Sequence, residues 1–162
     1  AWGWFGAPPA MKVSPESLTA YSFARDFAFL TLAGDAWHYW WHRLMHVPFF
    51  YKRFHKLHHL YTFTFVWINH AFHDFEILLF GLAVVVPPMV INTHVFTMWA
   101  FIAFTIISTG YSHSGYCFHP VVGYMAPMHD AHHYLVNKNF AAYYPFMDII
   151  FGTWAANTQS ER

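Results

Sequence analysis

Charged side chains are scarce in this sequence. Only 10% of its 162 residues are Asp, Glu, Lys or Arg, whereas soluble proteins carry roughly 25%. So few charges cannot cover a water-facing surface, and hydrophobic residues make up 57% and aromatic residues 23% of the chain. The composition therefore excludes an ordinary soluble domain and predicts an integral membrane protein. The length fits a single domain over residues 1–162.

The formal net charge of the chain is zero. Eight Lys and Arg residues balance eight Asp and Glu residues, so no overall field attracts nucleic acid, and we expect no nucleic-acid partner. Cysteine is nearly absent as well. Cys117 stands alone and cannot form an internal disulfide bond, which is compatible with a reducing compartment.

The few basic residues are unevenly placed. Half of them lie in one short stretch, as Arg43, Lys52, Arg53 and Lys56. Positive charge beside membrane segments favours the cytoplasmic side, so we expect this stretch to be cytoplasmic. These side chains are suited to docking an acidic electron donor, and equally to contacting lipid headgroups.

Histidine, by contrast, is abundant, with 14 residues. Eight of them form three packets: His42 and His46; His55, His58 and His59; His129, His132 and His133. On a helix, side chains three and four residues apart share a face, so each packet can point two imidazoles at one place. A single buried histidine is commonly a hydrogen-bonded core residue, but eight packed together without a metal would leave ring nitrogens unsatisfied. The spacing therefore predicts a metal site.

Helices are expected to carry the first two packets. We predict one helix over 15–46, ended by Pro48, and a short helix over 50–60. Residues 61–69 alternate like a strand, but without a partner strand an extended or interfacial linker is favoured.

Two apolar runs follow, on either side of Pro87 and Pro88. They predict a helical hairpin, re-entrant or spanning, with its break at these prolines. Such a hairpin would bring His113 back beside His73, so that ten histidines meet at one cytoplasmic surface.

The number of histidines favours two metal ions. Eight to ten imidazoles exceed what one tetrahedral or octahedral ion binds, and eight acids in the whole chain are too few for a carboxylate-based di-iron site. Imidazole suits iron, zinc, copper and nickel alike. Two redox-active ions at the ends of apolar helices suit activation of O2 against a lipid C–H bond, whereas a zinc hydrolase needs only three protein ligands.

The ordered motifs resemble the fatty acid hydroxylase/sterol desaturase superfamily. The resemblance rests on HRLMH at 42–46, RFHKLHH at 53–59, HDFE at 73–76, HSGY at 113–116, HDAHH at 129–133 and MDIIFGT at 147–153. It implies an all-α membrane oxygenase of the endoplasmic reticulum or the bacterial inner membrane with a non-haem di-iron centre. O2 would be the co-substrate, and a cytochrome b5 or ferredoxin-type donor with its reductase would supply electrons. Family members generally carry membrane helices upstream of the first motif, so we expect such helices to be missing from this sequence.

The resemblance also implies a ligand set. The family's metal ligands correspond to His42, His46, His55, His58, His59, His73, His113, His129, His132 and His133. Behind the ligands we expect His38 and three carboxylates, Asp35, Asp130 and Asp148, which would accept the second N–H of a ligating imidazole. We expect no catalytic residue separate from the metal centre. His94 and His119 should lie away from it, and His70 remains open.

Two classes of function follow. The first is an oxygenase that hydroxylates or desaturates a lipid or sterol, with motifs most similar to sterol C4-methyl oxidases and C5-desaturases. Fatty acid or alkane hydroxylases and aldehyde-deformylating enzymes are alternatives within the superfamily. The second class is a non-catalytic zinc-binding membrane protein, or a truncated relative. Two irons with O2-dependent lipid oxidation would favour the enzyme, and because zinc can also enter during expression, the product assay carries more weight.

Overall fold

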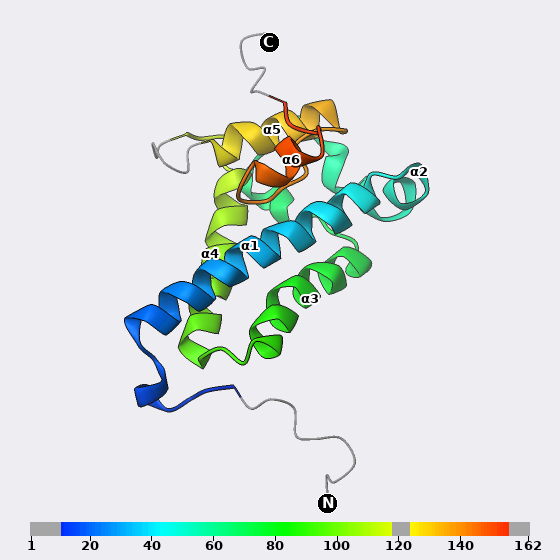
Figure 1. The fold of residues 1–162 in the computed structure, drawn as a ribbon. Coiled ribbons are helices and arrows are strands. Elements are labelled where there is room, and N and C mark those ends of the chain that lie inside the picture. The colour runs from blue at the N-terminus through cyan, green and yellow to red at the C-terminus, as the bar shows by residue number, and fades with distance from the viewer. Residues whose placement is uncertain (1–10, 118–123, 156–162) are drawn as a thin grey trace, which may run out of the picture.

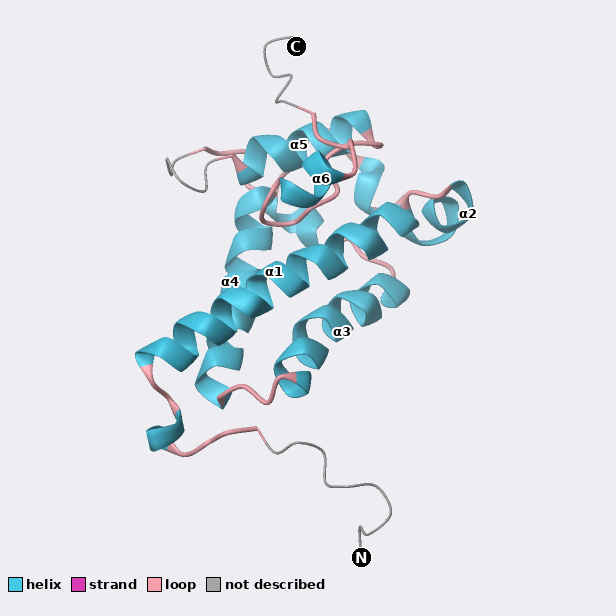
Figure 2. Cartoon of the chain, in the orientation of Figure 1, coloured by secondary structure: helices cyan, strands magenta, loops and turns pink. Residues whose placement is uncertain are grey.

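The computed structural model describes residues 11–117 and 124–155, and all regular structure within them is helical (Figure 1). The α-helices are α1 (Ala20–Met45), α2 (Pro48–Phe50), α3 (Asp74–Val90), α4 (Val95–Ser112), α5 (Met125–Leu135) and α6 (Phe146–Ile150). Short 3-10 turns cover Pro15–Ser17, His58–Leu60 and Val66–His70, and one π-helical turn covers Tyr51–His55. The described residues contain no strand (Figure 2). The all-α prediction is confirmed.

α1 begins later than the predicted start at residue 15. Ser14 and Pro15 open only a single 3-10 turn, and the long helix begins after Thr19. The Thr19 hydroxyl accepts the backbone N–H of Ser22, and the Ser22 hydroxyl accepts the backbone N–H of Thr19. This reciprocal capping box satisfies two N–H groups that a helix start leaves free, so it fixes the boundary.

The segment 48–60 is not the continuous short helix that we predicted. α2 runs into a wider π-helical turn, where the backbone N–H of Lys56 donates to the carbonyl of Tyr51 at 2.9 Å. A tighter 3-10 turn at His58–Leu60 follows. The changes of pitch alter the directions of His55, His58 and His59 relative to a regular helix.

The predicted break at Pro87 and Pro88 is wrong. α3 continues through both prolines and ends at Val90, which gives it 17 residues, or about 25 Å at 1.5 Å per residue. Proline lacks an N–H but keeps its carbonyl, and the carbonyls of Pro87 and Pro88 accept N–H groups of Ile91 and Thr93. The prolines therefore weaken the last turns without ending the helix there.

Three long helices, α1, α3 and α4, form the body of the molecule, with α3 and α4 joined by a short turn (Figure 1). α1 meets α4 closely at Gly34, where an added Cβ would lie 3.0 Å from Cζ of Phe101. At the turn, the Thr93 hydroxyl donates to Asp26 of α1 at 2.9 Å. α5 and α6 cover the end of this body where α1 and α4 finish (Figure 1). Nine histidines from these segments are thereby gathered at one end.

The body exposes an unusual number of large apolar side chains. Among them are Leu32 on α1, Leu82 and Val90 on α3, and Trp99 and Ile107 on α4. Exposed apolar side chains in such numbers are typical of a surface that contacts another apolar phase. Of the helices in the described residues, α4 is long and apolar enough to cross a membrane. How α3 and α4 lie relative to a bilayer stays a prediction.

Candidate metal centre

The structure brings nine of the ten predicted ligands into two adjacent groups. The five-histidine group consists of His42, His46, His55, His59 and His132. The four-histidine group consists of His58, His113, His129 and His133. Within each group the potential ligand atoms lie within 4.8 Å of one another, and every ring except the half-buried His46 is buried. Each group could therefore hold a metal ion.

Each HxxHH motif is divided between the two groups. His55 and His59 belong to the five-histidine group, while His58 points into the other group. In α5 the assignment is reversed, because His129 and His133 belong to the four-histidine group and His132 crosses to the first. On the regular helix α5, His129 and His133 point in nearly the same direction and His132 is rotated away from His133. The first motif reaches the same division through its π-helical and 3-10 turns. Each motif therefore contributes to both groups.

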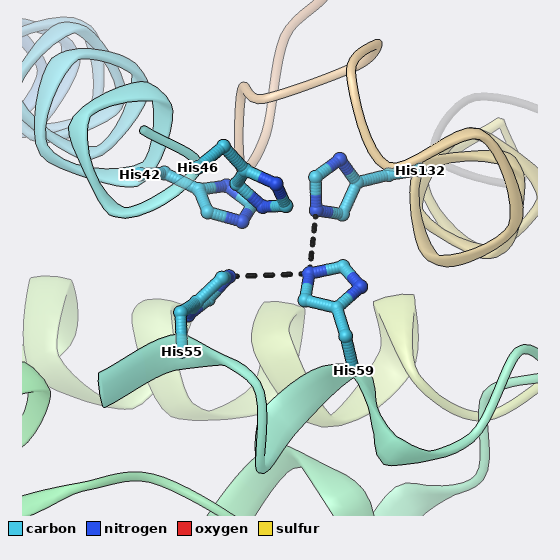
Figure 3. Close-up of side chains that lie close together, drawn as sticks. All are labelled: His42, His46, His55, His59 and His132. Carbon is cyan, nitrogen blue, oxygen red and sulfur yellow. Dashed lines mark hydrogen bonds between the residues drawn. The ribbon is translucent and has the colours of Figure 1, made fainter. Parts of the chain in front are cut away.

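The rings of the five-histidine group lie close together and point nitrogen atoms toward one another (Figure 3). Nε2 of His59 lies 3.1 Å from Nε2 of His55 and 3.1 Å from Nε2 of His132 (Figure 3). Nε2 of His42 is buried and has no hydrogen-bond partner. These positions bring electron-pair donors from α1, α5 and the segment 51–60 to one point.

The four-histidine group has the same inward arrangement. Nε2 of His129 lies 2.8 Å from Nε2 of His113 and 3.2 Å from Nε2 of His133. Nε2 of His113 lies 3.4 Å from Nε2 of His58. α4, α5 and the first HxxHH motif therefore meet here through their imidazoles.

The hydrogen bonds of Nδ1 determine whether Nε2 of the same ring carries a proton. Nδ1 of His42 donates to the carbonyl of Phe140 at 2.8 Å, and Nδ1 of His132 donates to the carbonyl of Lys138 at 2.6 Å. In the other group, Nδ1 of His113 donates to the carbonyl of Thr109 at 2.8 Å.

A neutral imidazole has one N–H, so each of these anchored rings presents an unprotonated Nε2. Several such lone pairs pointing at one another cannot form hydrogen bonds among themselves, since the shared proton is missing. They need an electron-pair acceptor, and a metal cation is the group that this donor set fits.

Burial keeps these rings neutral. Desolvation lowers the pKa of His133 to about 4, although its hydrogen bond to the carbonyl of Tyr61 opposes the effect. Desolvation and the neighbouring histidines likewise lower the pKa of His132 well below its ordinary value. A neutral imidazole has a free electron pair at pH 7, which is the form that binds a metal ion.

Glu76 is the functional residue that the sequence analysis missed. Its carboxylate is buried and accepts Nδ1–H of His55 through Oε1, while Oε2 accepts the backbone N–H of His73 at 3.1 Å. A carboxylate behind a ligating imidazole fixes the tautomer and makes the ligand more basic. The signal was present in the HDFE motif, where His73 drew attention as the ligand and Glu76 did not.

Two of the three predicted carboxylates, Asp35 and Asp148, accept backbone N–H groups of one loop. Asp148 accepts the backbone N–H groups of Phe140 and Ala141, each at 2.9 Å. Asp35 accepts those of Ala142 and Tyr143, at 2.9 and 2.7 Å. Together they hold the loop 138–143 whose carbonyls accept the N–H groups of His42 and His132. The expected hydrogen bonds are therefore made by backbone, because the loop lies between the carboxylates and the rings.

Asp130 has a different task. It accepts the backbone N–H of Thr64 at 3.1 Å, from its position on α5 next to His129. This contact ties α5 to the segment that follows the first HxxHH motif. Asp130 thus connects the two motif-bearing segments of the chain.

His73 lies outside both groups. It is exposed and caps α3, with Nδ1 accepting the backbone N–H of Phe75 at 3.2 Å. His38 packs edge-on against the rings of Trp41 and His42, with centroids 4.9 and 5.0 Å apart, so it lies beside a potential ligand as expected.

The remaining histidines stand apart from the two groups. His94 caps α4, its Nδ1 accepting the backbone N–H of Phe96 at 3.0 Å. His70 is exposed, at the end of the turn Val66–His70. The expectation for His119 lies outside the described residues.

The basic residues fall into two environments. Arg43 donates to the hydroxyl of Tyr39 at 2.7 Å and is partly buried. Lys52, Arg53 and Lys56 are exposed and line an open cavity of about 290 Å³ together with His73. A basic surface therefore lies beside the residue whose backbone contacts Glu76.

The sequence is similar to those of known proteins. A family model described as fatty acid hydroxylase matches residues 27–153. The chain is 31% identical to methylsterol monooxygenase 2-1 of Arabidopsis thaliana, over 90% of the chain and 58% of that protein. It is 32% identical to very-long-chain aldehyde decarbonylase GL1-11 of Oryza sativa subsp. indica (90% of the chain, 54% of that protein). It is also 32% identical to cholesterol 25-hydroxylase-like protein 2 of Danio rerio (93% and 57%).

The chain therefore spans little more than half the length of these curated relatives. No solved structure matches it significantly.

Proposed function

The chain belongs to the fatty acid hydroxylase family, and on that premise we propose that it is a di-iron membrane oxygenase acting on a lipid or sterol. The reaction proposed is hydroxylation or desaturation of a C–H site, with O2 as co-substrate and electrons from an external donor. The observation that supports it most is the pair of adjacent groups of unprotonated imidazole nitrogens. The relatives carry the names of sterol monooxygenases, an aldehyde decarbonylase and a sterol hydroxylase-like protein, so we propose the substrate only at the level of a lipid or sterol.

The donor set favours iron over structural zinc. Structural zinc is almost always four-coordinate and tetrahedral. Four histidines would satisfy that geometry, but the other group contains five. Five imidazoles suit a metal that uses five or six positions, such as iron. The non-catalytic zinc protein would account for one group and leave the other unexplained.

When bound, two iron ions would supply the redox chemistry that couples O2, two electrons and two protons to insertion of one oxygen atom into C–H, with water as the second product. The histidines of the two groups would hold the ions through their unprotonated ring nitrogens. The carbonyls of Lys138, Phe140 and Thr109 and the carboxylate of Glu76 keep the proton of each anchored ring on Nδ1. The buried, apolar surroundings exclude water from the reacting C–H bond.

Electrons are proposed to arrive at the basic cavity. Lys52, Arg53 and Lys56 line it and would dock an acidic donor protein of the cytochrome b5 or ferredoxin type. A short hydrogen-bonded connection leads inward from there, since the backbone N–H of His73 donates to Glu76, which accepts Nδ1–H of His55. The donor would thus reach the five-histidine group.

The same basic residues support a cytoplasmic position for the metal end of the molecule. Positive residues concentrate on the cytoplasmic side of membrane proteins, and three of the four in this stretch are exposed beside the metal centre. We therefore place the centre at the cytoplasmic face of the endoplasmic reticulum or of a bacterial inner membrane.

The test combines metal analysis with lipid chemistry. The protein is purified in mild detergent, iron and zinc per chain are measured, and lipid extracts of cells with and without it are compared by mass spectrometry. We expect two irons per chain and an oxidised lipid that requires O2. His94→Asn, which keeps a capping side chain on α4, serves as the histidine control. Stable zinc in both groups with no oxidised lipid would contradict the proposal.

A further inference from the structure

We propose that the lipid reaches the metal centre through an opening between α3 and α4, which admits substrates that present a slim end, a methyl or methylene group. The identity of the occupant rests on the proposed function, whereas the opening itself is a feature of the fold. The proposal rests on three observations. Two cavities share a wall, the outer cavity opens on apolar helix faces, and the opposite side of the histidine groups is covered.

The two cavities share a wall. The outer one contains about 220 Å³ of free volume and the inner one about 20 Å³. Asn69, Phe72, Phe80 and Thr109 line both. The cavities are therefore successive parts of one passage that narrows inward.

The inner cavity reaches both histidine groups. It is lined by His42 and His55 of the five-histidine group and by His58, His113 and His129 of the four-histidine group. A molecule that fills it lies against both metal positions. About 10–15 Å³ suffices for one water molecule, so the inner cavity has room for one group of about that size, such as a methyl group.

The outer cavity opens on the apolar faces of two helices. Ile77 of α3 and Ile106 of α4 line it, and they are 54% and 59% exposed. Both lie on the parts of the molecule whose large apolar side chains face outward. A lipid can therefore enter the passage without leaving an apolar phase, and its bulk can stay in the wider outer part.

The narrow part of the passage has fixed walls. Phe72 stacks on His58, with ring centroids 5.0 Å apart and planes 16° apart. The Asn69 side chain is buried and donates to the hydroxyl of Thr109 at 3.4 Å. The Thr109 carbonyl in turn accepts Nδ1–H of His113. Because these walls are bonded to potential ligands, the width of the passage is coupled to the metal centre.

The opposite side of the centre is covered. The ring of Phe140 lies over His46 and His132, with centroids 5.2 and 5.5 Å away. Tyr51 covers His46 and His59 in the same way, at 5.5 and 5.8 Å. The basic cavity has no member of either histidine group among its lining residues. Among the described cavities, the passage between α3 and α4 is the one that connects the metal centre to the apolar surface.

The experiment uses photo-crosslinking to the full chain in detergent. The probes are stearic acid and cholesterol, each carrying a diazirine, and labelled peptides are mapped by mass spectrometry. Ile106→Trp fills the mouth, and its matched control is Ile107→Trp, since Ile107 is 70% exposed on the same helix and lines neither cavity. Iron content is measured in every variant to confirm that the centre is intact.

We expect labelling around Phe72, Phe80 and Thr109 that excess unlabelled lipid suppresses. Ile106→Trp should reduce this competed labelling by about tenfold, the effect of about 1.4 kcal/mol, and Ile107→Trp should leave it unchanged. Equal labelling of the two variants, or labelling that unlabelled lipid cannot suppress, overturns the passage.

Size selection has its own test. Phe80→Ala should widen the narrow part and raise labelling by the cholesterol probe relative to the stearic acid probe severalfold. Leu79→Ala, at a neighbouring position that lines neither cavity, should leave the ratio unchanged. If the ratio of cholesterol to stearic acid labelling does not change in Phe80→Ala, the narrow part does not select substrates by the width of their ends.

The passage and the proposed function can fail separately. If the native protein oxidises a lipid and the two Trp variants do so equally well, the passage falls and the oxygenase stands. If labelling is competed and lost in Ile106→Trp while no lipid is oxidised, the passage stands and the oxygenase falls.

Discussion

The two histidine groups are built from the same side chain but have different surroundings. The five-histidine group is held by the Glu76 carboxylate and by carbonyls of the loop 138–143. The four-histidine group has carbonyls behind it, from Thr109 and Tyr61, and three of its members line the inner cavity. A carboxylate donates more electron density to a ligand than a carbonyl does. Both groups reach the inner cavity, but the five-histidine group is also connected, through Glu76 and the backbone of His73, to the basic surface.

The largest effect is expected from removing one ligand of either group. His58→Ala leaves three imidazoles in its group, and His132→Ala leaves four in the other. Both should lower product formation by more than about 100-fold, since changes behind the ligands already cost 10–100-fold. Iron should fall from two toward one per chain, and further in His58→Ala than in His132→Ala.

Metal content and product formation are measured on the same preparations. His94→Asn controls for the loss of a buried histidine, because His94 caps α4 and lies outside both groups. Full activity in either alanine variant would refute the assignment of that residue as a ligand. Equal iron loss in both variants would remove the proposed difference between the groups.

The next effect tests the carboxylate that distinguishes the groups. Glu76→Gln keeps an acceptor for Nδ1–H of His55 but removes the negative charge behind it. We expect iron affinity at the five-histidine group to fall by about 10–100-fold, with the other group unchanged, as measured by iron competition with a chelator. Glu16→Gln, on the exposed turn Pro15–Ser17, is the control. If both histidine groups of Glu76→Gln bind iron as tightly as those of the native protein, the proposed role of Glu76 is wrong.

A smaller effect is expected from loosening the loop behind the five-histidine group. The amide created by Asp148→Asn keeps only one acceptor oxygen. In one orientation it loses the hydrogen bond from the N–H of Ala141, and in the other it loses those from Phe140 and Thr153. Hydrogen bonds to charged groups contribute about 1.5–3 kcal/mol each, so thermal unfolding should occur at lower temperature. The exposed Asp74→Asn is the matched control. Unchanged stability together with unchanged iron retention would show that the loop does not support this group.

The smallest effect concerns the basic surface. Lys56→Glu should slow oxidation of a reduced acidic donor severalfold at low salt and reduce the salt dependence of that rate, because rim charges act mainly on association. Iron content and lipid labelling should not change. Lys12→Glu, remote from the cavity, is the control. Identical donor rates for the two variants would place donor docking elsewhere.

Much of the site could be predicted because helix geometry is local. Steps of three and four residues place His42 near His46 and His129 near His133 whatever the rest of the fold does. The division of the HxxHH motifs between two groups could not be predicted in the same way. It depends on how α5 lies across the segment 51–60, and on the π-helical turn at Tyr51–His55.

The differences between the expected and the observed positions share a cause, which is that a local sequence pattern allows two tertiary outcomes. HDFE offers both a histidine ligand and a capping box, and the structure uses His73 as the cap and Glu76 as the partner of His55. Asp35 and Asp148 do support the ligand rings, but through a loop more than 100 residues after Asp35. Such long-range contacts leave no periodicity in the sequence. The predicted break at Pro87 and Pro88 is wrong because prolines can end a helix or be accommodated within it, and α3 continues through both to Val90.

The most direct measurement is a crystal structure of the iron-loaded protein with anomalous difference maps recorded at the iron absorption edge. The account predicts two peaks, one surrounded by imidazole nitrogens of His42, His46, His55, His59 and His132, the other by those of His58, His113, His129 and His133. A single peak, or a peak bound by histidines outside these groups, would contradict it.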